Sequence, residues 1–177
     1  MPETTISFRI ATAHDIPTLK QVIESAFRAE DPREDWVGIQ ALASSFTVDE
    51  KYISSVISHA DSVFLIAHDK ANTVLGTIGA AKRESGTARL FMLAVDPQIH
   101  RGGIGRQILS FAEDYCQREW DTRVMSLDAL STRPSLVSWY MRRGYQKTGK
   151  TELFPRELAN GLELPEDLHF VDLEKRV

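Results

Sequence analysis

Residues 90–106 read LFMLAVDPQIHRGGIGR, and this stretch is the most informative part of the chain. An apolar run ends at Asp96-Pro97, and after a short loop a glycine-rich segment opens an amphipathic helix. The apolar face of that helix carries Ile104, Ile108, Phe111, Ala112 and Tyr115. Glycines let the backbone approach a ligand, and the first N–H groups of a helix attract anions. Arg101 and Arg106 add positive charge, so the sequence predicts a phosphate or pyrophosphate site here.

Two other phosphate-binding patterns can be compared with the same loop. A P-loop requires Lys followed by Ser or Thr after its last glycine, where this chain has Arg106-Gln107. Gly103-Ile104-Gly105 begins a dinucleotide fingerprint, but Ile108 takes the place of its third glycine and the loop is too long for the tight turn. Asp128 lies about 20 residues further on, where that fingerprint has its ribose-binding acid. A nicotinamide-dinucleotide site therefore stays open as a minor alternative.

Hydrophobic periodicity predicts further strands and helices on both sides of this stretch. We expect strands at 6–10, 62–67, 73–81, 87–95, 123–129 and 169–173, with Ser85-Gly86 as a hairpin turn. Helices are predicted from Asp15 to Phe27, from Gly103, and from Pro134 to Met141. A further helix is predicted to carry Tyr52, Ile53, Val56 and Ile57 behind a capping box of Thr47 and Glu50. Gly144 is the expected C-terminal cap of the last helix. This order predicts an α/β chain of the α+β type with a mixed sheet.

Composition excludes several classes of protein. The 177 residues, 42% of them hydrophobic, predict one globular domain over 1–177, and the net charge of −4 argues against a nucleic-acid binder. No apolar run is long enough to cross a bilayer, and the first ten residues do not resemble a secretory signal. Cys116 is the only cysteine, and the histidines lack the close spacing of zinc ligands, so we expect no disulfide and no metal site. A cytoplasmic protein without membrane partners is predicted.

A second block of sequence completes a family resemblance. Val95-Asp96-Pro97 with the Arg-Gly-Gly-Ile-Gly-Arg segment closely resembles the acetyl-coenzyme-A loop of the GNAT acetyltransferase superfamily. Residues 138–145, SWYMRRGY, are similar to the family's fourth helix and following strand, and the opening segment 8–12 with Asp15 extends the resemblance. The resemblance implies a mostly antiparallel sheet of about seven strands with four main helices.

The resemblance also assigns the binding of acetyl-coenzyme A (acetyl-CoA). A bulge splays the family's fourth strand, and the backbone at Leu93, Ala94 and Val95 would pair there with the pantetheine arm and the thioester carbonyl. The pyrophosphate would be held by the backbone of Arg101, Gly102, Gly103, Ile104, Gly105 and Arg106. His100 stands where the family usually has Gln or Arg. Arg133 replaces a common Asn, and it would contact the pantetheine arm or a phosphate.

The implied activity is direct acetyl transfer from acetyl-CoA to a primary amine in a ternary complex. Tyr140 matches the tyrosine that gives a proton to the leaving thiolate in many relatives. An alkylamine has a pKa of about 10 and arrives protonated, so the reaction needs a base, and Asp128 is the candidate. Glu84, on the hairpin, is a weaker one. The alternative is a non-catalytic module that binds acyl-CoA as a sensor or regulator.

The acceptor is expected to be a small cationic amine or a basic peptide. In the family, the loop between the first two helices and the segment before the last strand line the acceptor side. Here both are acidic, and acidic walls concentrate cations. Their charged residues are Glu30, Asp31, Arg33, Glu34 and Asp35 in the first, and Glu152, Arg156, Glu157, Glu163, Glu166 and Asp167 in the second. The sequence does not distinguish a monomer from a homodimer.

Overall fold

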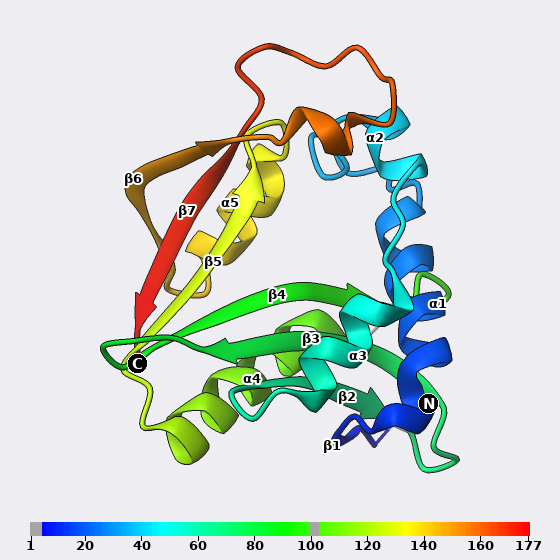
Figure 1. Cartoon of the computed structure of the whole chain (residues 1–177), viewed down its shortest axis with the longest axis vertical. Helices are drawn as coiled ribbons and strands as arrows, with labels where there is room; N and C mark the ends of the chain where they lie inside the picture. The colour runs from blue at the N-terminus through cyan, green and yellow to red at the C-terminus, as the bar shows by residue number, and fades with distance from the viewer. Residues whose placement is uncertain (1–4, 100–102) are drawn as a thin grey trace.

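The computed structural model describes residues 5–99 and 103–177, and its strands form one seven-stranded sheet. The order across the sheet is β1-β2-β3-β4-β5-β7-β6, and only β4 and β5 are parallel (Figure 1). The strands are β1 (Ser7–Ile10), β2 (Ser62–His68), β3 (Val74–Lys82), β4 (Thr87–Val95), β5 (Val124–Leu130), β6 (Gln146–Leu153) and β7 (His169–Arg176).

Helices cover both faces of this sheet. They are α1 (Ile16–Arg28), α2 (Gln40–Ser44), α3 (Glu50–Ser58), α4 (Ile104–Trp120) and α5 (Pro134–Met141), with single 3-10 turns at Ala13–Asp15 and Arg156–Ala159. The apolar faces of α4 and α5 bury one side of the sheet in the larger core, which contains Ile108 and Val137. The opposite side is covered by α1 and α3, whose Leu19 and Ile53 pack against Phe64 of β2.

The predicted fold class is confirmed: an α/β chain with seven mostly antiparallel strands and four main helices, α1, α3, α4 and α5. The predicted capping box is wrong, because α3 begins at Glu50 and its cap is Asp49, whose side chain accepts a 2.8 Å hydrogen bond from the N–H of Lys51. The short α2 was not predicted. No helix of residues 5–99 and 103–177 is long and apolar enough to cross a membrane.

The decisive feature of the sheet is the split between β4 and β5. The two strands pair only at Thr87↔Val124, Ala88↔Met125 and Arg89↔Ser126, and beyond these residues they diverge (Figure 1). A bulge lies just past the split, because the β3–β4 register shifts and Met92 has a φ of 50°. The β5-facing backbone of β4 after Arg89 therefore has no strand partner there, so its N–H and C=O groups are available to a ligand.

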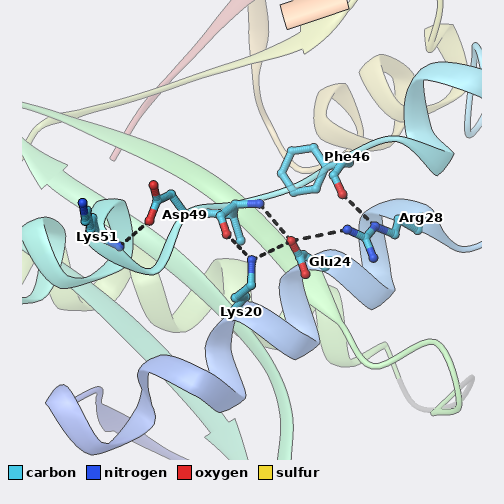
Figure 2. Close-up of polar contacts among 7 residues, drawn as sticks. Lys20, Glu24, Arg28, Phe46, Asp49 and Lys51 are labelled. Atoms are coloured by element: carbon cyan, nitrogen blue, oxygen red, sulfur yellow. Dashed lines mark hydrogen bonds and ion pairs between the residues drawn. The ribbon is translucent and has the colours of Figure 1, made fainter. Parts of the chain in front are cut away.

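The connection into α3 is held against α1 by a network of charges (Figure 2). Glu24 Oε2 accepts from Lys20 Nζ at 3.0 Å and from the N–H of Val48 at 3.1 Å. Arg28 lies 3.4 Å from the same carboxylate and donates to the carbonyl of Phe46 at 2.7 Å. Burial opposes ionisation of Glu24, but these partners outweigh it and lower its pKa. The network thus positions the start of α3.

Candidate functional site

The start of α4 lies next to the open end of the split. Gly103 caps the helix with a φ of 62°, a left-handed conformation that glycine adopts without strain. A Cβ on Gly105 would lie 3.6 Å from Val95 and 3.9 Å from Trp139, so α4, β4 and α5 meet here. Arg106 forms no ion pair among the described residues, which leaves its charge for an anion. The predicted contacts Arg101 and Gly102, and His100 beside them, lie outside the described residues.

Along β4, the predicted donor-binding residues follow the bulge. Ala94 and Val95 pair with Thr77 and Gly76 of β3 on one side only. The Ala94 side chain is buried in the core beneath α1 and α3, and Leu93 packs against the core of α4 and α5. What these residues offer to a ligand is therefore backbone, as expected for recognition of an amide-containing chain.

Tyr140 projects from α5 into the core beside the split. Its side chain is 7% exposed, and its ring meets Tyr145 edge-on at 5.8 Å between centroids. Burial raises the pKa of Tyr140 to about 12, while Arg133 lowers it and Asp128 raises it. The phenol is therefore protonated throughout the neutral range and can donate a proton.

Asp128 lies on β5 among charges from three neighbouring strands. Arg89 of β4 donates to Asp128 Oδ2 at 2.5 Å and to Ser126 Oγ at 3.1 Å, and so bridges the split at its closed end. Asp172 of β7 pairs in register with Asp128, lies 3.6 Å from Arg89, and accepts from Thr148 Oγ1 at 2.6 Å. Burial raises the pKa of Asp128, Arg89 lowers it, and Asp172 and Glu152 raise it, with a raised pKa as the net result.

Arg133 connects α5 to the loop between α1 and α2. Its Nε donates to the carbonyl of Trp36 at 2.6 Å, and Ser135 Oγ donates to the carbonyl of Glu34 at 2.6 Å. Trp36 also meets Trp139 edge-on at 6.4 Å. Burial lowers the pKa of Arg133, and the residue forms no ion pair within the described part of the chain. Its predicted contact with the donor stays a prediction.

The two acidic segments meet at one end of the molecule. Phe154 and Leu168 pack with Ile39 and Leu42 in a small apolar cluster, which brings the segment between β6 and β7 against α2 (Figure 1). Asp31 is already paired with Arg33 at 2.6 Å. Apart from Asp31, the predicted acidic residues of both segments are exposed: Glu30, Glu34, Asp35, Glu152, Glu157, Glu163, Glu166 and Asp167.

Sequence reasoning missed Arg89 and Asp172. Neither residue belongs to a motif, and they reach Asp128 only because β4, β5 and β7 lie side by side. Glu84, the weaker candidate base, lies in the turn between β3 and β4, and among the described residues its side chain takes no part in the hydrogen bonds and ion pairs of this cluster. In the same residues, no three His, Cys, Asp or Glu side chains come together as a metal-ligand set.

Comparisons with known proteins agree with this geometry. Residues 29–155 match the family model described as an acetyltransferase (GNAT) domain. The chain is 24% identical over 153 residues to S-(2-succino)cysteine N-acetyltransferase of Bacillus subtilis (strain 168), covering 82% of this chain and 87% of the relative.

Solved structures share the fold at lower identity. The ribosomal-protein-S18-alanine N-acetyltransferase of Escherichia coli superimposes with a TM-score of 0.72 at 14% identity, covering 98% of this chain and 94% of that one. Spermidine N-acetyltransferase of Vibrio cholerae, in complex with CoA and spermine, gives a TM-score of 0.67 at 14% identity, with 97% and 95% covered.

Proposed function

This chain belongs to the GNAT acetyltransferase family and is therefore an acyltransferase, and we propose that it moves an acetyl group from acetyl-CoA to a primary amine. The observation that carries the proposal is the split between β4 and β5, which leaves unpaired backbone on β4 between an anion-attracting helix start and a buried tyrosine. Both substrates would be bound together in a ternary complex.

The donor would lie along the split. Its pantetheine amides would pair with the backbone of Leu93, Ala94 and Val95, which follow the bulge at Met92 on the part of β4 that does not pair with β5. Its pyrophosphate would lie at the start of α4, where Gly103, Ile104, Gly105 and Arg106 supply free N–H groups and positive charge. Arg101, Gly102 and Arg133 are proposed as further contacts on sequence grounds.

The chemistry needs one base and one acid. Asp128, directly or through water, takes a proton from the ammonium of the acceptor, and the freed nitrogen attacks the thioester carbonyl. The carbon–sulfur bond breaks, and the leaving thiolate takes the proton of the Tyr140 hydroxyl. The nitrogen then loses its second proton, which restores the tyrosine. The products are an N-acetyl amine and coenzyme A.

Cys116 offers no route through an acyl-enzyme. Its side chain is 0% exposed in the core beneath α4, and burial together with the charge of Glu113 raises the pKa of its thiol to about 12. A thiolate is the nucleophilic form of cysteine, so a buried, protonated thiol supports direct transfer instead. The cytoplasmic location expected from this lone cysteine fits the proposal.

The relatives differ in the acceptors that their names give. One acts on S-(2-succino)cysteine, another on an alanine of a ribosomal protein, and a third on spermidine. These three acceptors differ in charge, so the relatives support a primary amine as the acceptor of this chain but do not indicate which kind of amine. The small cationic amine or basic peptide expected from the acidic segments stays a prediction.

A thermal melt with acetyl-CoA, run beside one with NAD, tests the donor. A ligand at about 100 times its dissociation constant stabilises the folded state by roughly 2.7 kcal/mol. For a domain of this size, that is a rise in Tm of about 5–10 °C. We expect the rise with acetyl-CoA alone. A rise with NAD alone would identify the glycine-rich loop as a dinucleotide site and overturn the proposal. The alternative of an acyl-CoA sensor predicts the same melt but no acetylated amine.

A further inference from the structure

Arg143 follows α5 and lies over the ring of Trp139, four residues earlier in the chain. Its Cζ is 4.2 Å from the centre of that ring, and its Nη1 donates to the carbonyl of Trp139 at 3.1 Å. The guanidinium is thus held in place by a stacked ring and a hydrogen bond. Its Nε is buried and has no hydrogen-bond partner within residues 5–99 and 103–177. A buried donor without an acceptor is unfavourable, and an acceptor on a ligand would remove that cost.

This guanidinium lies close to the start of α4. A Cβ on Gly105 would lie 3.9 Å from Trp139, so the ring that carries Arg143 also borders the proposed pyrophosphate site. Burial lowers the pKa of Arg143, and the charges of Arg142 and Arg106 lower it further, which agrees with three cations lying near one another.

No carboxylate neutralises these three arginines. Within the described part of the chain, Arg106, Arg142 and Arg143 form no ion pair. The carboxylate of Glu113 on α4 is already paired with Lys175 at 2.9 Å. Uncompensated cations, one of them with a fixed guanidinium, favour an anion that accepts several hydrogen bonds, as a phosphate does.

The proposed donor carries phosphate at two places, the pyrophosphate and the 3′-phosphate of its ribose. In the proposed arrangement the thioester lies at the split, and the pyrophosphate takes the free N–H groups at the start of α4. The adenosine follows the pyrophosphate on the side away from the thioester. The 3′-phosphate would then lie near Arg142 and Arg143, beyond the N–H groups that hold the pyrophosphate.

We propose that Arg143, with Arg142 beside it, binds the 3′-phosphate of the donor and makes the site specific for 3′-phosphorylated coenzyme A. This inference rests on the proposed function for the place of the donor, and goes beyond it by naming the residues that determine donor specificity. Arg143 supplies the fixed guanidinium, and the exposed Arg142 supplies a second charge. Both residues act on donor affinity and not on the chemical step.

Coenzyme A and 3′-dephospho-coenzyme A are the matched probes, because they differ only in this phosphate. Titration calorimetry should show that the protein binds coenzyme A at least about tenfold more tightly than the dephospho form, since hydrogen bonds between charged groups contribute about that much. Equal affinities for the two probes would overturn the inference.

Variants locate the effect at the end of α5. Arg142→Gln combined with Arg143→Gln should weaken the binding of coenzyme A at least about fivefold and leave that of the dephospho form unchanged. Arg143→Lys keeps the charge and should retain part of the preference. If the double variant bound both probes more weakly by the same factor, the arginines would act at the pyrophosphate or on the fold, and the inference would fail. Wild-type affinity for both probes would also overturn it.

Arg118→Gln combined with Arg123→Gln is the matched control. It removes the same charge at the other end of α4, where both side chains are exposed. Arg118 lies about 21 Å along the helix axis from Ile104. This control should bind both probes as the wild type does, and a loss equal to that of the double variant would mean that only the net charge matters.

Binding separates this inference from the proposed function. A preference for coenzyme A that the double variant loses would support the 3′-phosphate site even if no amine were acetylated, and the transferase proposal would then fail alone. Equal kcat/KM values for acetyl-CoA and its dephospho form would overturn the 3′-phosphate site and keep the transferase. With an amine that is acetylated, the double variant should raise the KM for acetyl-CoA and leave kcat unchanged, because the interaction is the same in the ground state and the transition state.

Discussion

Replacing Tyr140 with phenylalanine should abolish most of the turnover and leave the fold intact. Tyr140 is largely buried, and no hydrogen bond of its hydroxyl is found among the described residues, so loss of the hydroxyl removes no contact that holds the chain together. The ring, which packs against Tyr145 and Trp139, is kept.

The size of the effect follows from the role of the proton. General acid catalysis contributes about 10²–10⁴-fold, or roughly 2.7–5.4 kcal/mol of barrier. Because burial raises the pKa of Tyr140 to about 12, the wild-type acid stays protonated up to the alkaline limit of the assay. We therefore expect a fall in kcat of at least about 100-fold at every pH from 6 to 9, with unchanged Kd for acetyl-CoA.

Tyr145→Phe is the matched control, because the Tyr145 hydroxyl stabilises the fold and has no proposed role in catalysis. Tyr145 donates to Glu113 Oε2 at 3.0 Å, and Lys175 holds the other oxygen at 3.0 Å. Loss of a hydrogen bond to a charged group costs about 1.5–3 kcal/mol. This variant should lose several degrees of Tm and keep its kcat.

The assay is coenzyme A release under saturating acetyl-CoA, with a melt on each variant. A Tyr140→Phe enzyme that turns over within threefold of wild type would refute the argument. The argument would also be refuted if Tyr140→Phe and Tyr145→Phe lost the same amounts of kcat and of Tm, because both hydroxyls would then have the same structural role.

Three further outcomes are expected. Asp172→Asn removes a like charge and lowers the pKa of Asp128, so the acid limb of the pH profile of kcat/KM should move to lower pH. Arg89→Met removes an opposite charge and should move the same limb to higher pH. If the limb moved in the same direction in both variants, Asp128 would not be the base. Gly76→Ala should lower the stability by roughly 1–3 kcal/mol and Tm by several degrees, because a Cβ would lie 2.6 Å from the carbonyl oxygen of Ala94. An unchanged Tm would mean that β3 and β4 move apart to accept the methyl group, and would contradict the prediction. Glu24→Gln should cost about 1 kcal/mol at pH 7. The pKa of Glu24 is lowered in the folded state, so its contribution to stability is present above the usual pKa and is lost as the pH falls through the folded pKa. The difference in Tm between wild type and variant should therefore shrink as the pH is lowered, and a difference that stays constant would refute the charge network.

The local parts of this fold were predictable. Residues 90–106 encode a strand, a loop and a helix start within one short window, and the Pro134–Met141 helix begins at the proline that its sequence offers. Hydrophobic periodicity predicted six of the seven strands and the four main helices, whereas the strand at Gln146–Leu153 was expected only from the family resemblance. The α3 cap was misplaced because both Thr47 and Asp49 can cap, and only the structure shows which residue the helix follows.

The parts that depend on distant residues were not predictable. Asp128 meets Arg89 and Asp172 through strand pairing between elements that are far apart in sequence. The short α2 is stabilised by the apolar cluster with Phe154 and Leu168, not by its own five residues. The catalytic roles of Tyr140 and Asp128 stay predictions.

Following an isotopically labelled acetyl group tests the central claim most directly. The protein is incubated with labelled acetyl-CoA and a panel of primary amines, and label is counted in each amine and on the protein. Direct transfer predicts label in the amine, one coenzyme A released for each acetyl moved, and none on the protein. Bound acetyl-CoA with no labelled amine, for any amine offered, would contradict the transferase and leave a binding module, and label held on the protein would contradict the ternary complex.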